Sequence, residues 1–174
     1  QTASTLAEGI ALACAGGFDG ILLDLANIPQ ADLKNEIIEA ARSASTPVIS
    51  LLEEVPGLYF SGIDNYTAIQ TVMDHLICKH HCRTLNYVSG PAGSVENQQR
   101  FWAYRDALQK YGIPFDSMRV TGSTYEIENG IHAFSEFQNR ELLPDAFICA
   151  NDNIAVGICL AAKKAGYSIP DDFL

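Results

Sequence analysis

Short apolar runs alternate along this chain with longer segments in which apolar residues recur every three or four positions. The apolar runs are typical of buried strands, and the longer spacing predicts helices that bury one face. Proline and glycine mark segment ends, as at Thr46-Pro47 and Gly166. The pattern predicts strands at 18–25, 48–52, 58–63, 85–89, 119–121 and 146–150. It predicts helices at 2–14, between Pro29 and Thr46, and at 65–77, 95–111, 125–138 and 154–165.

Strands and helices follow each other in regular order along the whole chain. This order is typical of parallel strands joined by right-handed crossovers, with helices on both faces of the sheet. The sequence therefore predicts an α/β fold with open parallel sheets. In such sheets ligands bind beyond the carboxyl ends of the strands. The loops of interest follow Leu23, Leu51, Ile63, Ser89, Thr121 and Ala150.

Composition and charge narrow the class of protein. The 174 residues are 48% apolar and carry a net charge of −10 with only 11 lysines and arginines, so the chain lacks the clustered cations that grip nucleic acid. No apolar run reaches the roughly 18 residues of a membrane-spanning helix, and the first residues lack the basic start of a signal peptide. Five scattered cysteines are typical of buried thiols in a reducing compartment. We expect a cytoplasmic chain that does not contact a membrane.

A metal site is one alternative that the cysteines raise. The segment Cys78-Lys79-His80-His81-Cys82 sets two thiols around two imidazoles, with His75 one turn upstream. No second ligand pair follows at zinc-finger spacing. The segment is more typical of a helix end followed by a turn, and we expect no metal.

Motifs of catalysis are missing from the sequence. There is no glycine-rich phosphate loop of Walker or Rossmann spacing, and no Gly-x-Ser-x-Gly elbow. The four histidines do not stand beside a convincing nucleophile, and Asp171-Asp172 falls in a terminal turn. We therefore expect a protein that is not an enzyme and needs no cofactor.

Four segments in fixed order carry a family resemblance. Together they resemble the ligand-binding core of LacI/GalR-type transcriptional regulators, whose fold is similar to that of periplasmic sugar-binding proteins. The resemblance departs from the family at Ala103, where glycine is usual, and at 78–82, where a glycine-containing turn is usual. The segments are Ile63-Asp64-Asn65-Tyr66-Thr67-Ala68, Tyr87-Val88-Ser89-Gly90-Pro91, Arg100-Phe101-Trp102-Ala103-Tyr104-Arg105-Asp106-Ala107-Leu108 and Ile148-Cys149-Ala150-Asn151-Asp152-Asn153-Ile154-Ala155-Val156-Gly157.

The resemblance implies a two-lobed, type I periplasmic-binding-protein-like domain with a ligand between the lobes. A first crossing near 62–66 would divide the chain into a partial N-terminal lobe, 1–63, and a partial C-terminal lobe, 64–174. The family's helix-turn-helix headpiece, the first strand-helix-strand and the closing strands of both lobes lie outside this sequence. We therefore expect a domain that is incomplete at both ends.

Three residues of the second half are the strongest candidates for ligand contact. Arg100, expected in the first turn of its helix, stands where the family's ligand-contacting arginine stands, and its guanidinium is suited to paired hydroxyls or a carboxylate. The alternative is a solvated arginine. Asn151 follows a buried strand and offers an amide to hydroxyls, or else caps the next helix. Tyr125 resembles a pocket aromatic of the family, with core packing as the alternative.

Candidates in the first half are weaker. Asp24 ends a strand and could accept from hydroxyls or cap the next helix. Phe60 matches a pocket aromatic of some family members, although an inward-facing core residue is the commoner outcome. Asp64 is expected to hold the hinge by capping its helix. Where many relatives have an acidic residue at the end of the second strand, this chain has Leu52.

The resemblance implies a domain that binds a small, sugar-like effector and biases an attached output. The expected partners are the effector and a second copy of the chain in a homodimer, with DNA contacted only through a headpiece outside these residues. Two alternatives remain open at this point. One is a sensor joined to a diguanylate cyclase or AraC-type output, and the other is a periplasmic solute-binding protein.

Overall fold

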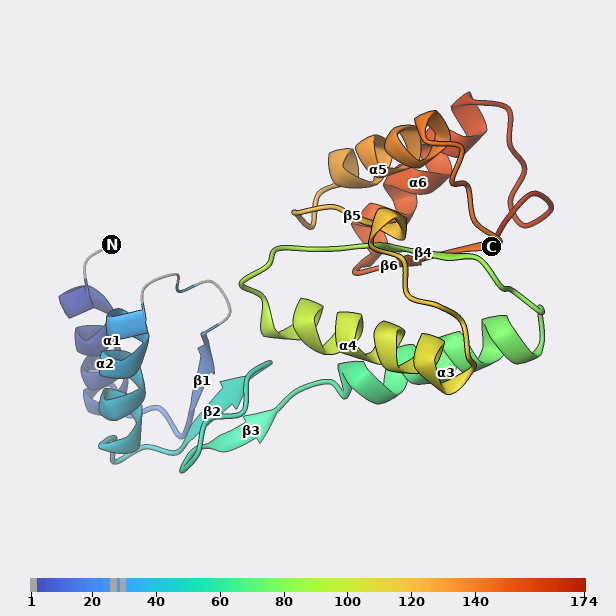
Figure 1. Cartoon of the computed structure of the whole chain (residues 1–174). Helices are drawn as coiled ribbons and strands as arrows, with labels where there is room; N and C mark the ends of the chain where they lie inside the picture. The colour runs from blue at the N-terminus through green and yellow to red at the C-terminus, as the bar shows by residue number, and fades with distance from the viewer. Residues whose placement is uncertain (1–2, 26–27, 29–30) are drawn as a thin grey trace. The chain divides into compact units, whose positions relative to one another are not determined.

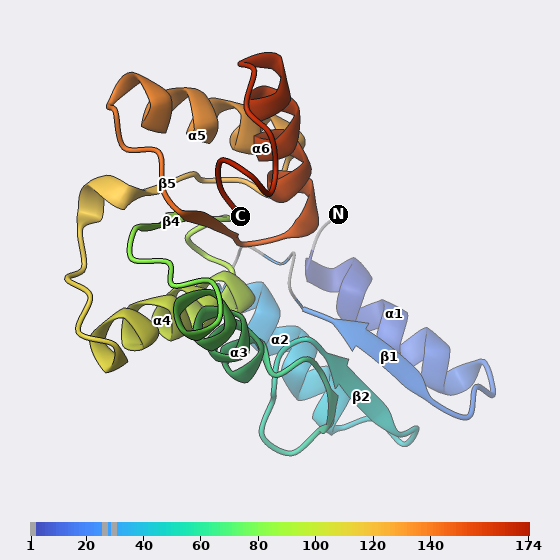
Figure 2. The same ribbon diagram turned by 90° about the vertical axis from the view of Figure 1, so that its right-hand side faces the viewer.

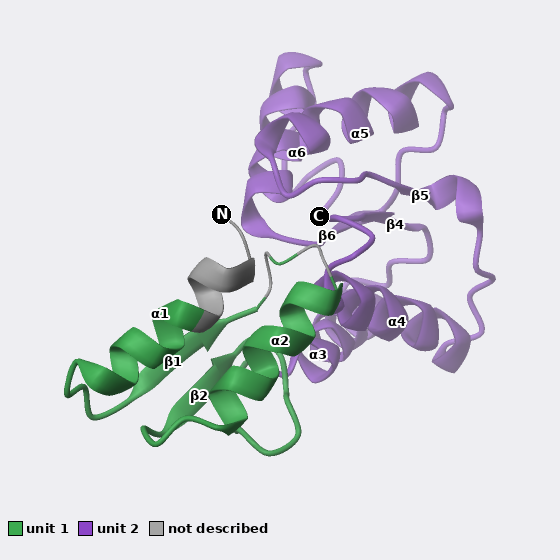
Figure 3. Ribbon diagram, turned by 90° about the vertical axis from the view of Figure 1, so that its left-hand side faces the viewer, with its two compact units in different colours: residues 1–63 green, residues 64–174 purple. Residues whose placement is uncertain are grey.

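The computed structural model describes residues 3–25, 28 and 31–174, with side chains from residue 8 onward in these ranges. Pro29, predicted to open the second helix, lies outside the described residues. The chain forms two compact units, Gln1–Ile63 and Asp64–Leu174 (Figure 3). Each unit contains its own parallel sheet and its own buried core.

The first unit is a three-stranded parallel sheet covered by two helices. Its elements are α1 (Ala3–Ala15), β1 (Ile21–Asp24), α2 (Ala31–Arg42), β2 (Val48–Leu51) and β3 (Tyr59–Ser61), in the sheet order β1-β2-β3. Both helices lie on the same side of the strands (Figures 1 and 3). Ile37 of α2 and Val48 of β2 are buried between these layers, whereas Leu22 of β1 is 69% exposed. One face of this sheet therefore carries the core.

The second unit is larger and has helices on both faces of its sheet. Its elements are α3 (Asn65–Cys78), β4 (Leu85–Val88), α4 (Val95–Lys110), the 3₁₀ turn η1 (Ser117–Arg119), β5 (Val120–Thr121), α5 (Ile127–Asn139), β6 (Ala146–Cys149) and α6 (Asp152–Lys164). The strand order is β5-β4-β6, and both pairings are parallel. Figures 1 and 2 show α3 and α4 on one side of the strands, with α5 and α6 on the other. The predicted α/β class is confirmed.

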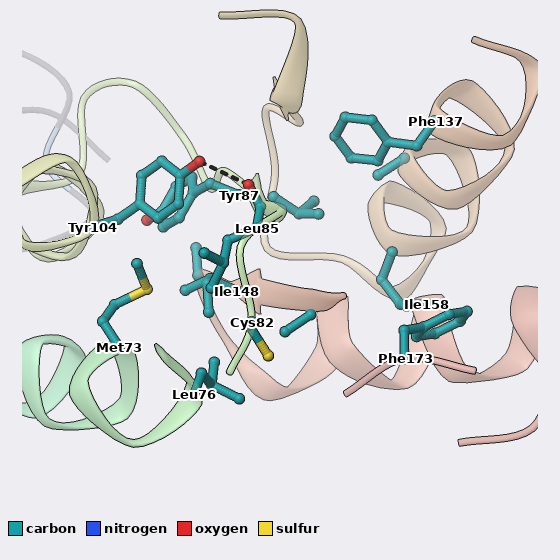
Figure 4. Packing of buried hydrophobic residues seen from close by; sticks show 14 of the residues in the cluster. Met73, Leu76, Cys82, Leu85, Tyr87, Tyr104, Phe137, Ile148, Ile158 and Phe173 are labelled. Carbon is teal, nitrogen blue, oxygen red and sulfur yellow. Dashed lines mark hydrogen bonds between the residues drawn. The ribbon is translucent and has the colours of Figure 1, made fainter. Parts of the chain in front are cut away.

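The core of the second unit is built around β4, whose four residues are all buried. Tyr104 of α4 is 1% exposed and satisfies its hydroxyl by donating to the Leu85 carbonyl at 2.9 Å (Figure 4). Phe134 and Phe137 of α5 pack on the opposite face. The resulting core fixes the carboxyl ends of β4 and β6, where the candidate residues lie.

Candidate ligand-binding site

A pocket of about 430 Å³ lies at the carboxyl end of β6 in the second unit. Two of the candidates predicted from the sequence, Arg100 and Asn151, line it. The remaining lining residues combine apolar walls with one carboxylate. They are Ile69 from α3, Phe147, Cys149 and Ala150 along and after β6, and Asp152 and Ala155 from α6.

Arg100 is held in place from two sides. Its Nε donates to Asn65 Oδ1 at 2.9 Å, and its Nη1 donates to the Ala150 carbonyl oxygen. The side chain is half-buried, so the solvated alternative is wrong. The residue is also the sixth of α4, which places it in the second turn and not the first, because the helix starts at Val95. The guanidinium is thus oriented before any ligand arrives, which lowers the entropy lost on binding.

Asn151 is the N-cap of α6. Its Oδ1 accepts from the Ile154 N–H at 3.0 Å, and its Nδ2 donates to the Tyr125 carbonyl oxygen at 3.0 Å. The structural role considered for Asn151, that of a helix cap, is therefore confirmed. An amide can accept two hydrogen bonds and donate two. Contact between Asn151 and a ligand remains a prediction.

Tyr125 packs on the loop after β4. Its hydroxyl lies 2.7 Å from Ser94 Oγ, and its ring covers Gly90 so closely that a Cβ there would lie 2.2 Å from Tyr125 Cε1. The side chain is half-buried against the core, and Tyr125 does not line the pocket described above. It is linked to the pocket through its carbonyl, which Asn151 binds.

Buried amides that the sequence analysis did not single out support this end of the sheet. Asn97 is 4% exposed, accepts from the Gly90 N–H at 2.9 Å and donates to Ser89 Oγ at 3.0 Å. Asn65, the partner of Arg100, also donates to Gln99 at 3.1 Å. Asn97 was missed because it lies inside the expected helix and its partners, Ser89 and Gly90, belong to the loop before that helix. Asn65 was named only as part of a family motif.

Cys149 is the thiol nearest to the candidate chemistry, since it lines the pocket. Burial raises the pKa of Cys149 to about 12, with a smaller contribution from Cys159. The thiol therefore stays protonated at neutral pH. Since only the thiolate is nucleophilic, Cys149 serves as a small apolar part of the pocket wall.

Two other candidates lie in the first unit, and a third is the first residue of the second unit. Asp24 is exposed at the carboxyl end of β1. Phe60 is 46% exposed in β3, so the core alternative is wrong, and its ring covers the backbone of Gly62. Asp64 caps α3 as predicted, accepting from the Thr67 N–H at 2.9 Å, and hydrogen bonds from Thr67 lower the pKa of Asp64. Ligand contact by Asp24 and Phe60 and hinge action by Asp64 remain predictions.

The Cys78–Cys82 segment does not assemble the set of ligands considered from the sequence. Cys82 is 3% exposed in the core, whereas Cys78 is exposed and donates to the Tyr111 hydroxyl at 3.3 Å. Within the ranges that the structure describes, no group of three or more His, Cys, Asp or Glu side chains is placed to hold a metal. No described helix has both the length and the apolar character to cross a membrane.

The parallel sheets define the class of the molecule as an open α/β domain, with a pocket at the strand end where such folds hold their ligands. The chain belongs to the family of periplasmic binding proteins and the sugar binding domain of the LacI family, whose model matches residues 2–173. The resemblance to LacI/GalR-type regulators is thereby confirmed.

Individual relatives are transcriptional regulators. The chain is 26% identical over 157 residues to the probable HTH-type transcriptional repressor ExuR of Bacillus subtilis, covering 89% of this chain and 46% of that protein. It is 28% identical over 166 residues to the maltose regulon regulatory protein MalI of Escherichia coli, covering 92% of this chain and 46% of that protein. The chain thus spans about half the length of these curated relatives.

Solved structures share the fold. A sugar-binding transcriptional regulator of the LacI family from Escherichia coli, complexed with phosphate, gives a TM-score of 0.82 at 18% identity over 99% of this chain and 61% of that one. A LacI-family regulatory protein from Chloroflexus aggregans gives a TM-score of 0.81 at 20% identity, over 98% of this chain and 60% of that one. These likenesses confirm the periplasmic-binding-protein-like fold.

Proposed function

We propose that this chain is the effector-binding part of a LacI/GalR-type transcriptional regulator and that it binds a small, sugar-like molecule. The observation that carries the proposal is the fixed position of Arg100 beside Asn151 at the carboxyl end of β6. A guanidinium and an amide together offer donors and an acceptor to neighbouring hydroxyls, the pattern that a sugar presents. No step of this function needs catalysis.

The two units would act as the partial N-terminal and C-terminal lobes of the sensor, with Asp64 at the hinge between them. An effector that binds one arrangement of lobes more tightly than another would shift the regulator between two states. A homodimer would pass this shift to a DNA-binding headpiece outside these residues, in the cytoplasm. The relatives described above are transcriptional regulators, which supports this output over a diguanylate cyclase, an AraC-type domain or periplasmic transport.

Substitution of Arg100 tests the proposed site. The full-length regulator would first be screened by thermal shift against sugars, sugar phosphates, nucleobases and amino acids. Arg100→Ala should then weaken the best hit by about 2 kcal/mol or more, roughly 30-fold, because hydrogen bonds to a charged donor are lost. Calorimetry with the same compound measures the change.

Arg105→Ala is the matched control. Arg105 is exposed on the same helix and stacks over Phe115 at 5.2 Å, away from the pocket residues. Its substitution should leave affinity unchanged, while circular dichroism checks that both variants are folded. Equal affinities of the wild type and a folded Arg100→Ala variant would refute the assignment.

A further inference from the structure

The carboxyl end of α3 folds back on itself in a way that brings two histidines together. The helix ends at Cys78, and the N–H of the C-cap residue Lys79 donates to the His75 carbonyl. The next turn returns the chain through His81, whose φ is 59°, so that the Cys82 N–H donates to the Leu76 carbonyl at 3.1 Å. This hydrogen bond closes the turn that follows the helix. It places His80 against the last turn of the helix.

His75 and His80 face each other through the same ring atom. Their Nε2 atoms are 3.0 Å apart, their ring centroids are 4.8 Å apart, and the ring planes meet at 62°. Both side chains are exposed. A metal with ligand bonds of about 2.0–2.1 Å holds two imidazole nitrogens about 3.0 Å apart at a right angle, and slightly farther apart in a tetrahedron. The spacing of the pair therefore suits two adjacent positions around one ion.

The anchors of this turn keep the two rings close. Cys82 is buried in the core directly after His81, and Met73 and Leu76 fix the last turns of α3 in the same core. Binding to a pair that is already adjacent loses less conformational entropy than binding to two independent side chains. The backbone thus supports chelation by both rings at once.

Asp74 and Cys78, the polar neighbours of His75 on α3, already have partners. Asp74 accepts from Lys110 at 2.8 Å and from the Tyr111 hydroxyl at 2.9 Å, and Cys78 donates to that hydroxyl. As stated above, the described residues contain no set of three ligands. An ion on this pair would therefore be held by two imidazoles, with water in its remaining positions.

We propose that His75 and His80 form a two-histidine site for a divalent first-row transition metal. Neutral imidazole is a suitable ligand for nickel, copper and zinc. The site lies at the carboxyl end of α3 and is independent of the proposed effector function. Without an ion, the same two nitrogen atoms share a hydrogen bond.

Titration of the untagged full chain with Ni²⁺ alone, followed by calorimetry, tests the site. Binding of one ion per pair is expected for the wild type. His75→Ala and His80→Ala should each weaken it by about a hundredfold, because a second linked ligand raises affinity by that order. Because both side chains are exposed, neither substitution should prevent folding. Circular dichroism would check this.

Two control variants define the site further. His132→Ala removes the exposed histidine of α5, and Cys78→Ser removes the nearest exposed thiol. Both should bind Ni²⁺ as the wild type does. The proposal is overturned if the wild type shows no saturable binding, or if folded His75→Ala binds with unchanged affinity.

Thermal unfolding gives a second readout. An ion that binds only the folded turn stabilises the folded state, so excess Ni²⁺ should raise the Tm of the wild type and of His132→Ala. The Tm of His75→Ala and His80→Ala should stay the same with and without Ni²⁺. An equal rise in all four proteins would place the ion elsewhere and reject this pair.

Discussion

His81 is a residue-scale example of local strain. It lies in the left-handed region with a φ of 59°, which is costly for a residue with a Cβ. Glycine adopts this conformation freely but is also more flexible when unfolded, which offsets part of the gain. His81→Gly should therefore raise the free energy of unfolding by about 0.5–1 kcal/mol, measured by urea denaturation.

Gly112 provides the opposite control. It has a φ of 65°, and a Cβ there would meet no atom within 4 Å, so only the backbone conformation is at issue. Gly112→Ala should lower stability by about 1 kcal/mol. If His81→Gly is no more stable than the wild type, the strain assigned to this turn is absent.

Asp145 ties the amino ends of two strands together. Its Oδ2 accepts from the backbone N–H groups of Arg83 and Thr84, both at 2.7 Å. Partial burial acts to raise the pKa of the Asp145 carboxyl, but the hydrogen bonds from Thr84 and Arg83 outweigh it and hold the pKa below its usual value. The ionised form therefore stabilises the folded state above the unfolded pKa, and this stability is lost as the pH falls through the lowered folded pKa.

Asp145→Asn should consequently cost about 1 kcal/mol at pH 7, because two charge-assisted hydrogen bonds become neutral ones. The difference between the wild type and the variant should shrink as the pH falls toward 3. Urea unfolding at a series of pH values measures it. A difference that is constant from pH 7 to pH 3 would contradict the argument.

Single residues also show how far the site could be predicted from the sequence. Arg100 could be singled out because the family resemblance places a ligand-contacting arginine there, and Asn151 because it follows a buried strand directly. The bonds that orient them could not be predicted, since the Asn65 amide and the Ala150 carbonyl approach Arg100 only in the folded unit. Tyr125 was predicted as a helix start, but α5 begins at Ile127, and the Tyr125 carbonyl instead accepts from Asn151.

At the scale of elements, the apolar pattern predicted each strand within a few residues. The ends moved where caps acted, and α6 starts at Asp152, before the predicted Ile154, because Asn151 caps it. The order of the strands in the sheet could not be predicted in this way. Nothing in the periodicity distinguishes β5-β4-β6 from other orders, since pairing depends on crossovers between distant segments.

The contact between α5 and α6 depends on two facing glycines. A Cβ at Gly157 would lie 2.1 Å from the Ile127 carbonyl oxygen and 2.9 Å from the Gly130 Cα. Helix propensity alone favours alanine by about 1 kcal/mol. Backbone atoms cannot move aside as a side chain does, so the clash outweighs propensity. Gly157→Ala should lower stability by about 2 kcal/mol, measured by denaturant unfolding.

Gly93→Ala is the control for this helix contact. Gly93 lies in the loop before α4, and a Cβ there would meet nothing within 4 Å. Its substitution should change stability by less than about 0.5 kcal/mol. A Gly157→Ala variant as stable as Gly93→Ala would show that the two helices do not approach as closely as the structure has them.

At the scale of the whole molecule, the two units differ in how much apolar surface they bury. Among the described residues, the core of Asp64–Leu174 contains twenty buried apolar residues, and that of Gln1–Ile63 contains six. The second unit has helices on both faces of its sheet, whereas Leu22 and Tyr59 of the first are 69% and 71% exposed. Small domains are marginal because they bury a smaller fraction of their surface.

Residues 64–174 expressed alone should therefore fold, with one cooperative urea transition seen by both far-UV and near-UV circular dichroism. The cap at Asp64 is retained at the start of this piece, so α3 keeps its first turn. Residues 1–63 alone should show no cooperative transition, because a short sheet with one bare face buries too little to offset the entropy of ordering the chain. A cooperative 1–63 piece, or an unfolded 64–174 piece, would mean that the stability of this chain is not concentrated in the unit that contains Arg100 and Asn151.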